Sequence, residues 1–222
     1  LVLLLLLVGH PSQSACRQAL VLALDVSSSI DAAEYTVQMQ GLARVLSDPE
    51  VQSLFLSNPD APIDLAIFEW AGEVDQRLIA DWTRIESSAD LSRIAARLSS
   101  AAPPGGQKPT ALGSALLFAA RLLAERPECW QHVIDVSGDG KNNSGVDPAA
   151  AKQSPDFDGV TVNALVIGKA FETTDEIAGN LIAELTAYFH HDVIHGPDAF
   201  IETALGFEDF FRAMKKKLLR ET

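Results

Sequence analysis

The chain has 222 residues, of which 47% are apolar and 21% are charged, and its formal net charge at pH 7 is −13. This apolar content excludes an intrinsically disordered protein, and the length favours one large domain over two small ones. The acidic balance argues against nucleic acid and anionic membranes as partners, because their phosphates would be repelled.

Residues 1–14 have the composition of a secretory signal peptide. Leu1–Val8 is an unbroken aliphatic run, and the small residues after it favour cleavage before Ala15. The run is too short to span a membrane, and we find no other stretch that could. No initiator Met or basic stretch precedes the run, so we expect the sequence to be truncated at its start. Export to the periplasm or the exterior implies an oxidising compartment.

Two cysteines remain in the mature chain, and each precedes an apolar run. Cys16 comes before Ala19–Leu24, and Cys129 comes before Val133–Val136. If the two runs are neighbouring parallel strands, both cysteines lie at the same edge of a sheet and a disulfide becomes geometrically feasible. Two unpaired thiols are one alternative. Acylation of Cys16 is another, although that signal needs an aliphatic residue three positions earlier, where Gln13 stands.

Apolar runs alternate with amphipathic stretches along the first half of the chain. A continuous apolar run is typical of a strand buried on both faces of a parallel sheet, and period-3.6 patterns indicate helices. In chain order we expect a strand at Ala19–Leu24, a helix from the capping box Asp31–Glu34 to about Leu46, ended by Asp48-Pro49, a strand at Ile63–Trp70, a tight turn at Ala71-Gly72, an antiparallel partner strand at Val74–Trp82, and helices at Ser88–Ser99 and Ala111–Ala124.

The second half continues the alternation. We expect strands at Gln131–Val136 and Val160–Ile167, a helix at Ile177–Phe189, a short edge strand at Phe200–Ala204, and a closing amphipathic helix at Phe207–Leu219. Lys215–Lys217 falls in the last turns of that helix, where cations suit the helix dipole. The whole pattern predicts a single α/β domain over residues 15–222. Its doubly wound, mostly parallel six-stranded sheet carries helices on both faces and one antiparallel edge strand.

The first strand runs into a loop of alternating oxygen ligands. Asp25, Ser27 and Ser29 follow at the carboxyl end of this strand, where open α/β sheets bind their ligands. A carboxylate and two hydroxyls are the hard oxygens that Mg²⁺ prefers. Three oxygens do not complete an octahedron, so other loops or water must contribute.

Two further oxygen ligands stand at equivalent positions. Thr110 follows the Pro/Gly-rich loop 103–106 and precedes a helix, and Asp139 follows the strand Gln131–Val136. If that strand neighbours the first, Asp139 and Asp25 face each other at one edge of the sheet.

These three segments resemble the metal-ion-dependent adhesion site (MIDAS) of the von Willebrand factor type A (vWA) domain. That site combines Asp-x-Ser-x-Ser, a Thr from a second loop and an Asp from a third, which here are the residues Asp25, Ser27, Ser29, Thr110 and Asp139. The likeness covers about residues 18–219, and the wording of residues 133–143 is similar to an exported bacterial branch without an assigned function. The family fold implies the strand order 3-2-1-4-5-6, which supports the pairing of Cys16 with Cys129.

The resemblance also implies what the site does. We expect a metal-binding protein and not an enzyme, with Mg²⁺, or Mn²⁺ or Ca²⁺, on the five ligands and a partner protein supplying an Asp or Glu carboxylate to the open position. A metal-assisted hydrolase, and a structural partner in an envelope assembly with a vestigial metal site, are the alternatives. The oligomeric state, the physiological metal and the pathway stay open.

Two residues depart from the family pattern. Gly138 stands where the family has Thr, and Asp135 lies inside a strand where an apolar residue is usual. A buried carboxylate needs partners, so Asp135 either supports the metal ligands or is a hydrogen-bonded core residue, and we favour the latter.

Other motifs are weaker. Residues 139–143 lack the spacing of an EF-hand calcium loop and indicate a turn that presents Asp139. His190, His191, Asp192 and His195 match no standard zinc spacing. Trp70 lies near the predicted metal edge and suits either a partner surface or the core.

Overall fold

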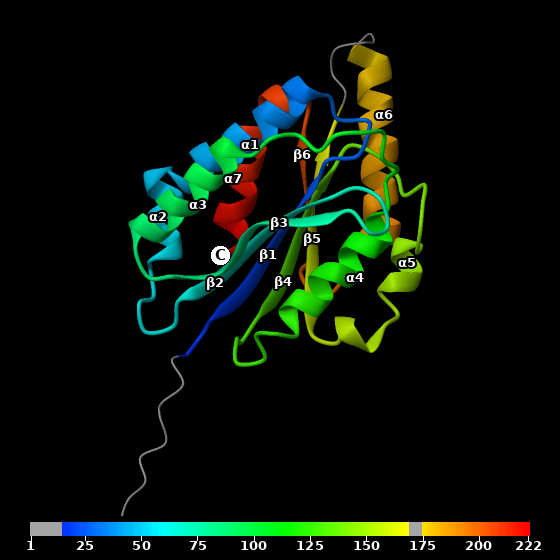
Figure 1. Cartoon of the computed structure of the whole chain (residues 1–222). Helices are drawn as coiled ribbons and strands as arrows, with labels where there is room; N and C mark the ends of the chain where they lie inside the picture. The colour runs from blue at the N-terminus through cyan, green and yellow to red at the C-terminus, as the bar shows by residue number, and fades with distance from the viewer. Residues whose placement is uncertain (1–14, 169–174) are drawn as a thin grey trace, which may run out of the picture.

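A six-stranded sheet forms the centre of this computed structural model, which describes residues 15–168 and 175–222 (Figure 1). The predicted signal peptide at residues 1–14 lies outside the described residues. The strand order is β3-β2-β1-β4-β5-β6, with β3 antiparallel at one edge and the other five strands parallel. This confirms the predicted fold class. The strands are β1 (Gln18–Asp25), β2 (Ile63–Trp70), β3 (Gln76–Ile85), β4 (His132–Gly138), β5 (Val160–Ile167) and β6 (Ile201–Ala204).

Helices cover both faces of the sheet (Figure 1). One face carries α1 (Ala32–Leu46), α2 (Pro49–Phe55), α3 (Ser88–Ser100) and α7 (Phe210–Glu221). The other face carries α4 (Leu112–Leu123), α5 (Pro148–Ala151) and α6 (Asp175–Tyr188). A π-helical segment, Phe189–Val193, continues α6, and short 3₁₀ segments lie at Pro155–Phe157 and Phe207–Asp209. None of the helices in the described ranges has the length and apolar character needed to cross a bilayer.

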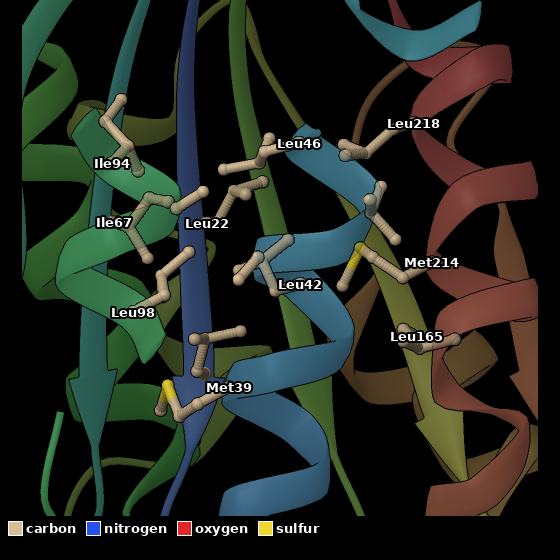
Figure 2. Packing of buried hydrophobic residues seen from close by; sticks show 14 of the residues in the cluster. Leu22, Met39, Leu42, Leu46, Ile67, Ile94, Leu98, Leu165, Met214 and Leu218 are labelled. Atoms are coloured by element: carbon tan, nitrogen blue, oxygen red, sulfur yellow. The ribbon is translucent and has the colours of Figure 1, made fainter. Parts of the chain in front are cut away.

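The core on the first face is built by residues at helical spacing. Met39, Leu42 and Leu46 of α1 recur every three or four positions, so they share one face of the helix. Figure 2 shows them packed with side chains from both neighbouring helices and from the strands beneath, namely Leu22, Ile67, Ile94, Leu98, Leu165, Met214 and Leu218. All eight residues of β1 are buried, because the sheet is covered on both faces.

One helix and one strand boundary differ from the prediction for local reasons. The first helix ends at Leu46, as predicted before Asp48-Pro49, but a second helix that was not predicted follows it. The Asp48 side chain accepts a hydrogen bond from the Glu50 amide at 3.0 Å and opens α2 with proline in its first turn. The turn after β2 is also longer than predicted. Asp75 and Ala71 close it through backbone hydrogen bonds, so β3 begins at Gln76.

A disulfide joins Cys16 to Cys129 at the amino ends of β1 and β4. The two residues form a parallel bridge that extends the pairing of these strands, and both are buried. The predicted pairing is therefore confirmed, and it followed from the adjacency of the two strands.

A buried ion cluster fastens α7 to the sheet. The Nζ atom of Lys217 lies 2.7 Å from Asp135 Oδ1 and 2.7 Å from Glu221 Oε1, and the three side chains are at most 1% exposed. Asn163 of β5 donates to Glu221 Oε1 at 2.6 Å. Burial, together with the negative charge of Asp135, raises the pKa of Glu221 to about 8. Asp135 is thus a core residue that pairs with a lysine of α7.

The lysine run of α7 is explained by these partners and not by the helix dipole alone. Lys217 is fully buried in the cluster, Lys215 pairs with Asp48 at 2.9 Å, and Lys216 pairs with Glu202 at 2.9 Å. Each lysine therefore bonds a carboxylate, two of them far away in sequence. The dipole explanation of the sequence pattern was incomplete.

Candidate metal site

Three loops meet at the carboxyl edge of the sheet. Asp25 is the last residue of β1, and Asp139 directly follows the last residue of β4. These strands are parallel neighbours whose register pairs Leu24 with Ser137, so both carboxylates reach the same edge. Thr110 arrives from the segment before α4.

The loop that follows β1 and the loop that follows β4 are in direct contact. The Ser29 hydroxyl donates to Asp139 Oδ1 at 2.6 Å, and the hydroxyl oxygens of Ser27 and Ser29 lie 3.1 Å apart. The Asp-x-Ser-x-Ser segment is therefore a curved loop whose polar side chains turn toward the β4 loop.

Asp25 has one oxygen without a hydrogen bond. Its Oδ1 accepts from the Ser27 amide at 2.8 Å, whereas Oδ2 is buried and has no hydrogen-bond partner. Burial, and next the negative charge of Asp139, raise the pKa of Asp25 to about 7. Two carboxylates thus converge at this edge, and the negative charge of Asp139 opposes the ionisation of Asp25.

Thr110 is held against the Asp139 loop by main-chain and side-chain bonds. Its amide donates to Asn143 Oδ1 at 2.8 Å, and its carbonyl accepts from the Asn143 amide at 2.9 Å. A side chain at Gly140 would place its Cβ 4.0 Å from Thr110 Oγ1, which shows how near the threonine hydroxyl is to this loop. Asn143 is a positioning residue that sequence reasoning did not single out.

A second pair of contacts joins the first loop to the Thr110 loop. The Ser28 amide donates to the Lys108 carbonyl at 3.0 Å, and the Lys108 amide donates to the Ser28 hydroxyl. All three loops are therefore connected by hydrogen bonds. Ser28, at an unassigned position of the motif, is one of the connecting residues.

Gly138 has a steric reason to depart from the family pattern. A Cβ atom at this position would lie 3.2 Å from Asp25 Oδ2 and 3.4 Å from the Phe189 ring. Glycine leaves room for both groups. The departure therefore fits the local packing and leaves the five oxygen-bearing residues in place.

The donor set suits a hard divalent cation. The five predicted residues supply two carboxylates and three hydroxyls, and oxygen ligands of this kind are typical of Mg²⁺, Mn²⁺ and Ca²⁺ sites. Ser29 is exposed, whereas the other four are at most 6% exposed: Asp25, Ser27, Thr110 and Asp139. A cation held here would be reached from solvent on the Ser29 side.

The other candidates lie elsewhere or lack ligands. His191 Nδ1 bonds the neighbouring Asp192 at 2.7 Å on an exposed π-helical turn, and Trp70 is fully buried in the core. Among the described residues, the cluster of three or more potential His, Cys or acidic ligands is Cys16, Asp64 and Cys129. Its two sulfurs are consumed by the disulfide, so it offers no thiolate.

Known structures share this fold. A proximal thread matrix protein from the mussel byssus, with a zinc-occupied MIDAS motif, has a TM-score of 0.60 at 17% identity, over 92% of this chain and 48% of that one. The pilus adhesin SpaC from Lactobacillus rhamnosus GG has a TM-score of 0.60 at 14% identity, and the match covers 94% of this chain and 31% of that one. A von Willebrand factor type A protein from Catenulispora acidiphila has a TM-score of 0.56 at 19% identity, and the match covers 92% of this chain and 42% of that one.

These likenesses establish the vWA-like fold, and this chain spans less than half the length of each of the three proteins. No curated protein sequence matches it. A family model described as "Protein of unknown function (DUF1194)" matches residues 15–222, and the chain therefore belongs to this family.

Proposed function

We propose that this chain is an exported, metal-dependent protein-binding module. A divalent cation, Mg²⁺ in the first instance, is held by Asp25, Ser27, Ser29, Thr110 and Asp139, and a partner protein supplies an Asp or Glu carboxylate to it. No covalent bond is made or broken.

The observation that carries this proposal is the buried Asp25 carboxyl. Its Oδ2 atom has no hydrogen-bond partner, and the negative charge of Asp139 opposes its ionisation. An unsatisfied buried oxygen costs free energy. Such an oxygen is accounted for when a ligand supplies the missing partner. A cation would satisfy this oxygen and remove the repulsion between the two carboxylates.

The chemistry of the ligand set supports binding of a further carboxylate. Three of the five ligands are neutral hydroxyls, so the protein does not saturate a cation with charged ligands. The exposed side at Ser29 gives a partner access. Similar folds occur in a pilus adhesin and in a thread matrix protein with a metal-occupied MIDAS, which supports an adhesive role.

The placement of potential bases favours binding over hydrolysis. His132 and His195 lie at the amino ends of β4 and β5, opposite the candidate site, and His191 pairs with Asp192. Metal-dependent turnover of phosphate esters that is lost in Asp139→Ala would reverse this assignment.

Export is supported by the disulfide between Cys16 and Cys129. Such bonds persist in oxidising compartments, which include the periplasm and the exterior.

Thermal unfolding with Mg²⁺ or Mn²⁺ and with EDTA tests the metal site. The intact protein is expected to melt at a higher temperature with metal, because a ligand that binds only the native state stabilises it. Asp25→Asn is expected to abolish this rise while melting no lower than the intact protein in EDTA, since it removes a buried carboxyl that resists ionisation. Asp60→Asn, an exposed aspartate before β2, is the matched control and keeps the rise.

Partner binding is tested with the same three proteins. Cross-linking pull-downs from the exported fraction are expected to recover a partner in Mg²⁺, and to lose it in EDTA and in Asp25→Asn. Recovery that is unchanged by EDTA would contradict the proposal and favour a structural role with a vestigial site.

A further inference from the structure

A small apolar pocket lies directly beside the candidate metal site. It has a volume of about 260 Å³ and is formed between the carboxyl end of β5 and the side of α6. Its apolar lining includes Ile167, Leu181, Ile182 and Leu185, and Asp139 stands at its edge. The same Asp139 accepts a hydrogen bond from the Ser29 hydroxyl, so the pocket and the candidate metal site share a residue.

The absence of a side chain at Gly168 keeps this pocket open. A Cβ atom there would lie 2.9 Å from Ile182 Cδ1 and 2.8 Å from the Leu205 carbonyl oxygen. Leu181 of the pocket lining is 51% exposed, and Leu205, whose carbonyl lies next to Gly168, is 66% exposed. Exposed apolar surface gathered in a hollow is typical of an interaction site.

Charged side chains also line the pocket. Lys141 and Glu184 form an ion pair at its edge, with exposed fractions of 47% and 65%. Lys141 also lies over the Tyr188 ring, with Nζ 5.9 Å from the centroid. An apolar centre with a hydrated polar rim is the arrangement of a protein interface.

The size and lining of the pocket determine its occupant. Small-molecule sites usually exceed about 300 Å³, so this pocket suits one side chain better than a cofactor. We propose, resting on the function proposed above, that it binds a large apolar side chain adjacent to the metal-bound carboxylate. The partner thus presents an Asp or Glu beside a Leu, Ile, Met or Phe.

The continuity of the two sites makes this pairing specific. A carboxylate at the cation and a side chain in the pocket both contact the surroundings of Asp139, so neighbouring residues of one partner segment reach both. The apolar side chain selects among acidic segments, since the cation alone accepts any exposed carboxylate.

Short blocked dipeptides test the proposal without knowledge of the partner. The probes are N-acetyl-Asp-Leu-amide and N-acetyl-Leu-Asp-amide. In the polar controls, Asn replaces the Leu of each probe and the Asp is kept. Binding is followed by methyl NMR of the pocket leucines and Ile182 in Mg²⁺ and in EDTA. The better of the two Leu probes is expected to bind about tenfold tighter than its Asn analogue in Mg²⁺, because it buries an aliphatic side chain.

A matched pair of surface variants assigns the preference to this pocket. Leu181→Asn is expected to remove the tenfold difference while the rise in melting temperature with Mg²⁺ is unchanged. Leu78→Asn, at an exposed leucine of the opposite edge strand β3, is expected to keep both properties.

The outcomes separate this inference from the proposed function. Equal affinities of Leu and Asn probes that both require Mg²⁺ would overturn the pocket assignment and leave the metal function standing. A Leu preference that persists in EDTA would support the pocket but contradict carboxylate binding through the metal. No methyl shift with any probe in Mg²⁺ would overturn the inference.

Discussion

At the scale of single residues, Asp25 links burial to the proposed metal binding. The pKa of its carboxyl is raised to about 7 by burial and by Asp139, whereas an exposed aspartate titrates near 3.8. A group with a raised carboxyl pKa stabilises the fold when protonated, and this contribution is lost as the pH rises through about 7. A cation needs the ionised form, so we expect the proposed metal affinity and the stability of the metal-free fold to respond to pH in opposite directions.

We therefore expect the affinity for Mn²⁺ to fall about tenfold per pH unit below pH 7, because one proton competes with the cation. In EDTA the same carboxyl is expected to make the fold less stable as the pH rises from 5 to 8. Calorimetric titration with Mn²⁺ and melting curves in EDTA measure the two trends. An affinity that does not change between pH 5.5 and pH 7.5 would contradict the assignment of Asp25 as a ligand.

Glu221, in the buried cluster with Asp135 and Lys217, provides a second pH effect. The pKa of this carboxyl is raised to about 8 by burial and by Asp135. Its stabilising effect is fully present below about pH 4.5 and is lost as the pH rises through 8. We expect Glu221→Gln to flatten the pH dependence of the free energy of unfolding between pH 5 and 9.

Urea unfolding at several pH values measures this change. Gln keeps the acceptor that Asn163 uses but cannot ionise. Equal slopes of stability against pH in both proteins would show that Glu221 is ionised throughout. Glu50→Gln, on an exposed carboxylate, serves as the control.

At the scale of elements, the contact between α1 and α7 depends on a glycine. A Cβ atom at Gly41 would lie 2.8 Å from the Phe210 ring, which is fully buried. Gly179 in α6, by contrast, is exposed and has no atom within 4 Å of such a Cβ. Alanine at Gly41 therefore reports the cost of overpacking, whereas alanine at Gly179 reports the gain in helix propensity alone.

We expect Gly41→Ala to destabilise the protein by about 1–2 kcal/mol, because crowding outweighs the gain in helix propensity. Gly179→Ala is expected to stabilise it by about 0.5–1 kcal/mol. Chemical denaturation of both variants gives the two free energies. A stabilised Gly41→Ala would mean that Phe210 moves aside at no cost.

The elements predicted most accurately are those whose sequence reflects complete burial. β2 and β5 have the predicted bounds, because proline or glycine borders each mostly apolar run: Pro62 and Gly72 lie around β2, and Gly159 and Gly168 around β5. β3 lies at an edge and is only partly buried, so its alternating pattern does not mark where it begins. The helix α2 was missed because a proline that ends one helix can also open the next.

The sequence predicts that the candidate residues converge at one edge of the sheet, but it does not predict the residues that support them. Asp25, Thr110 and Asp139 follow recognisable strands and loops, and the fold brings them together. Asn143 and Ser28 act through bonds to backbone atoms of distant loops, which leave no pattern in the sequence. The same holds for Asp135 and Lys217, whose pairing depends on how α7 crosses the sheet.

At the scale of the whole molecule, the disulfide closes a long loop. Cys16 and Cys129 are 113 residues apart, and a bond across such a separation lowers the entropy of the unfolded chain. We expect Cys16→Ala/Cys129→Ala to lose about 4 kcal/mol of stability and about 8–16 °C in melting temperature.

Melting curves of this double variant and of the reduced wild-type protein measure the loss. The two are expected to agree, because both lack the bond. A shift below about 2 °C in both would show that the unfolded chain is already compact in this region.

The disulfide and the candidate metal site lie at opposite ends of the same two strands. β1 leads from Cys16 to Asp25, and β4 leads from the neighbourhood of Cys129 to Asp139. A pulling force applied between Cys16 and the Asp25 loop would therefore run lengthwise along β1. It would load the hydrogen bonds to both parallel neighbours together, in shear and not one after another, and the disulfide would pass part of the tension to β4.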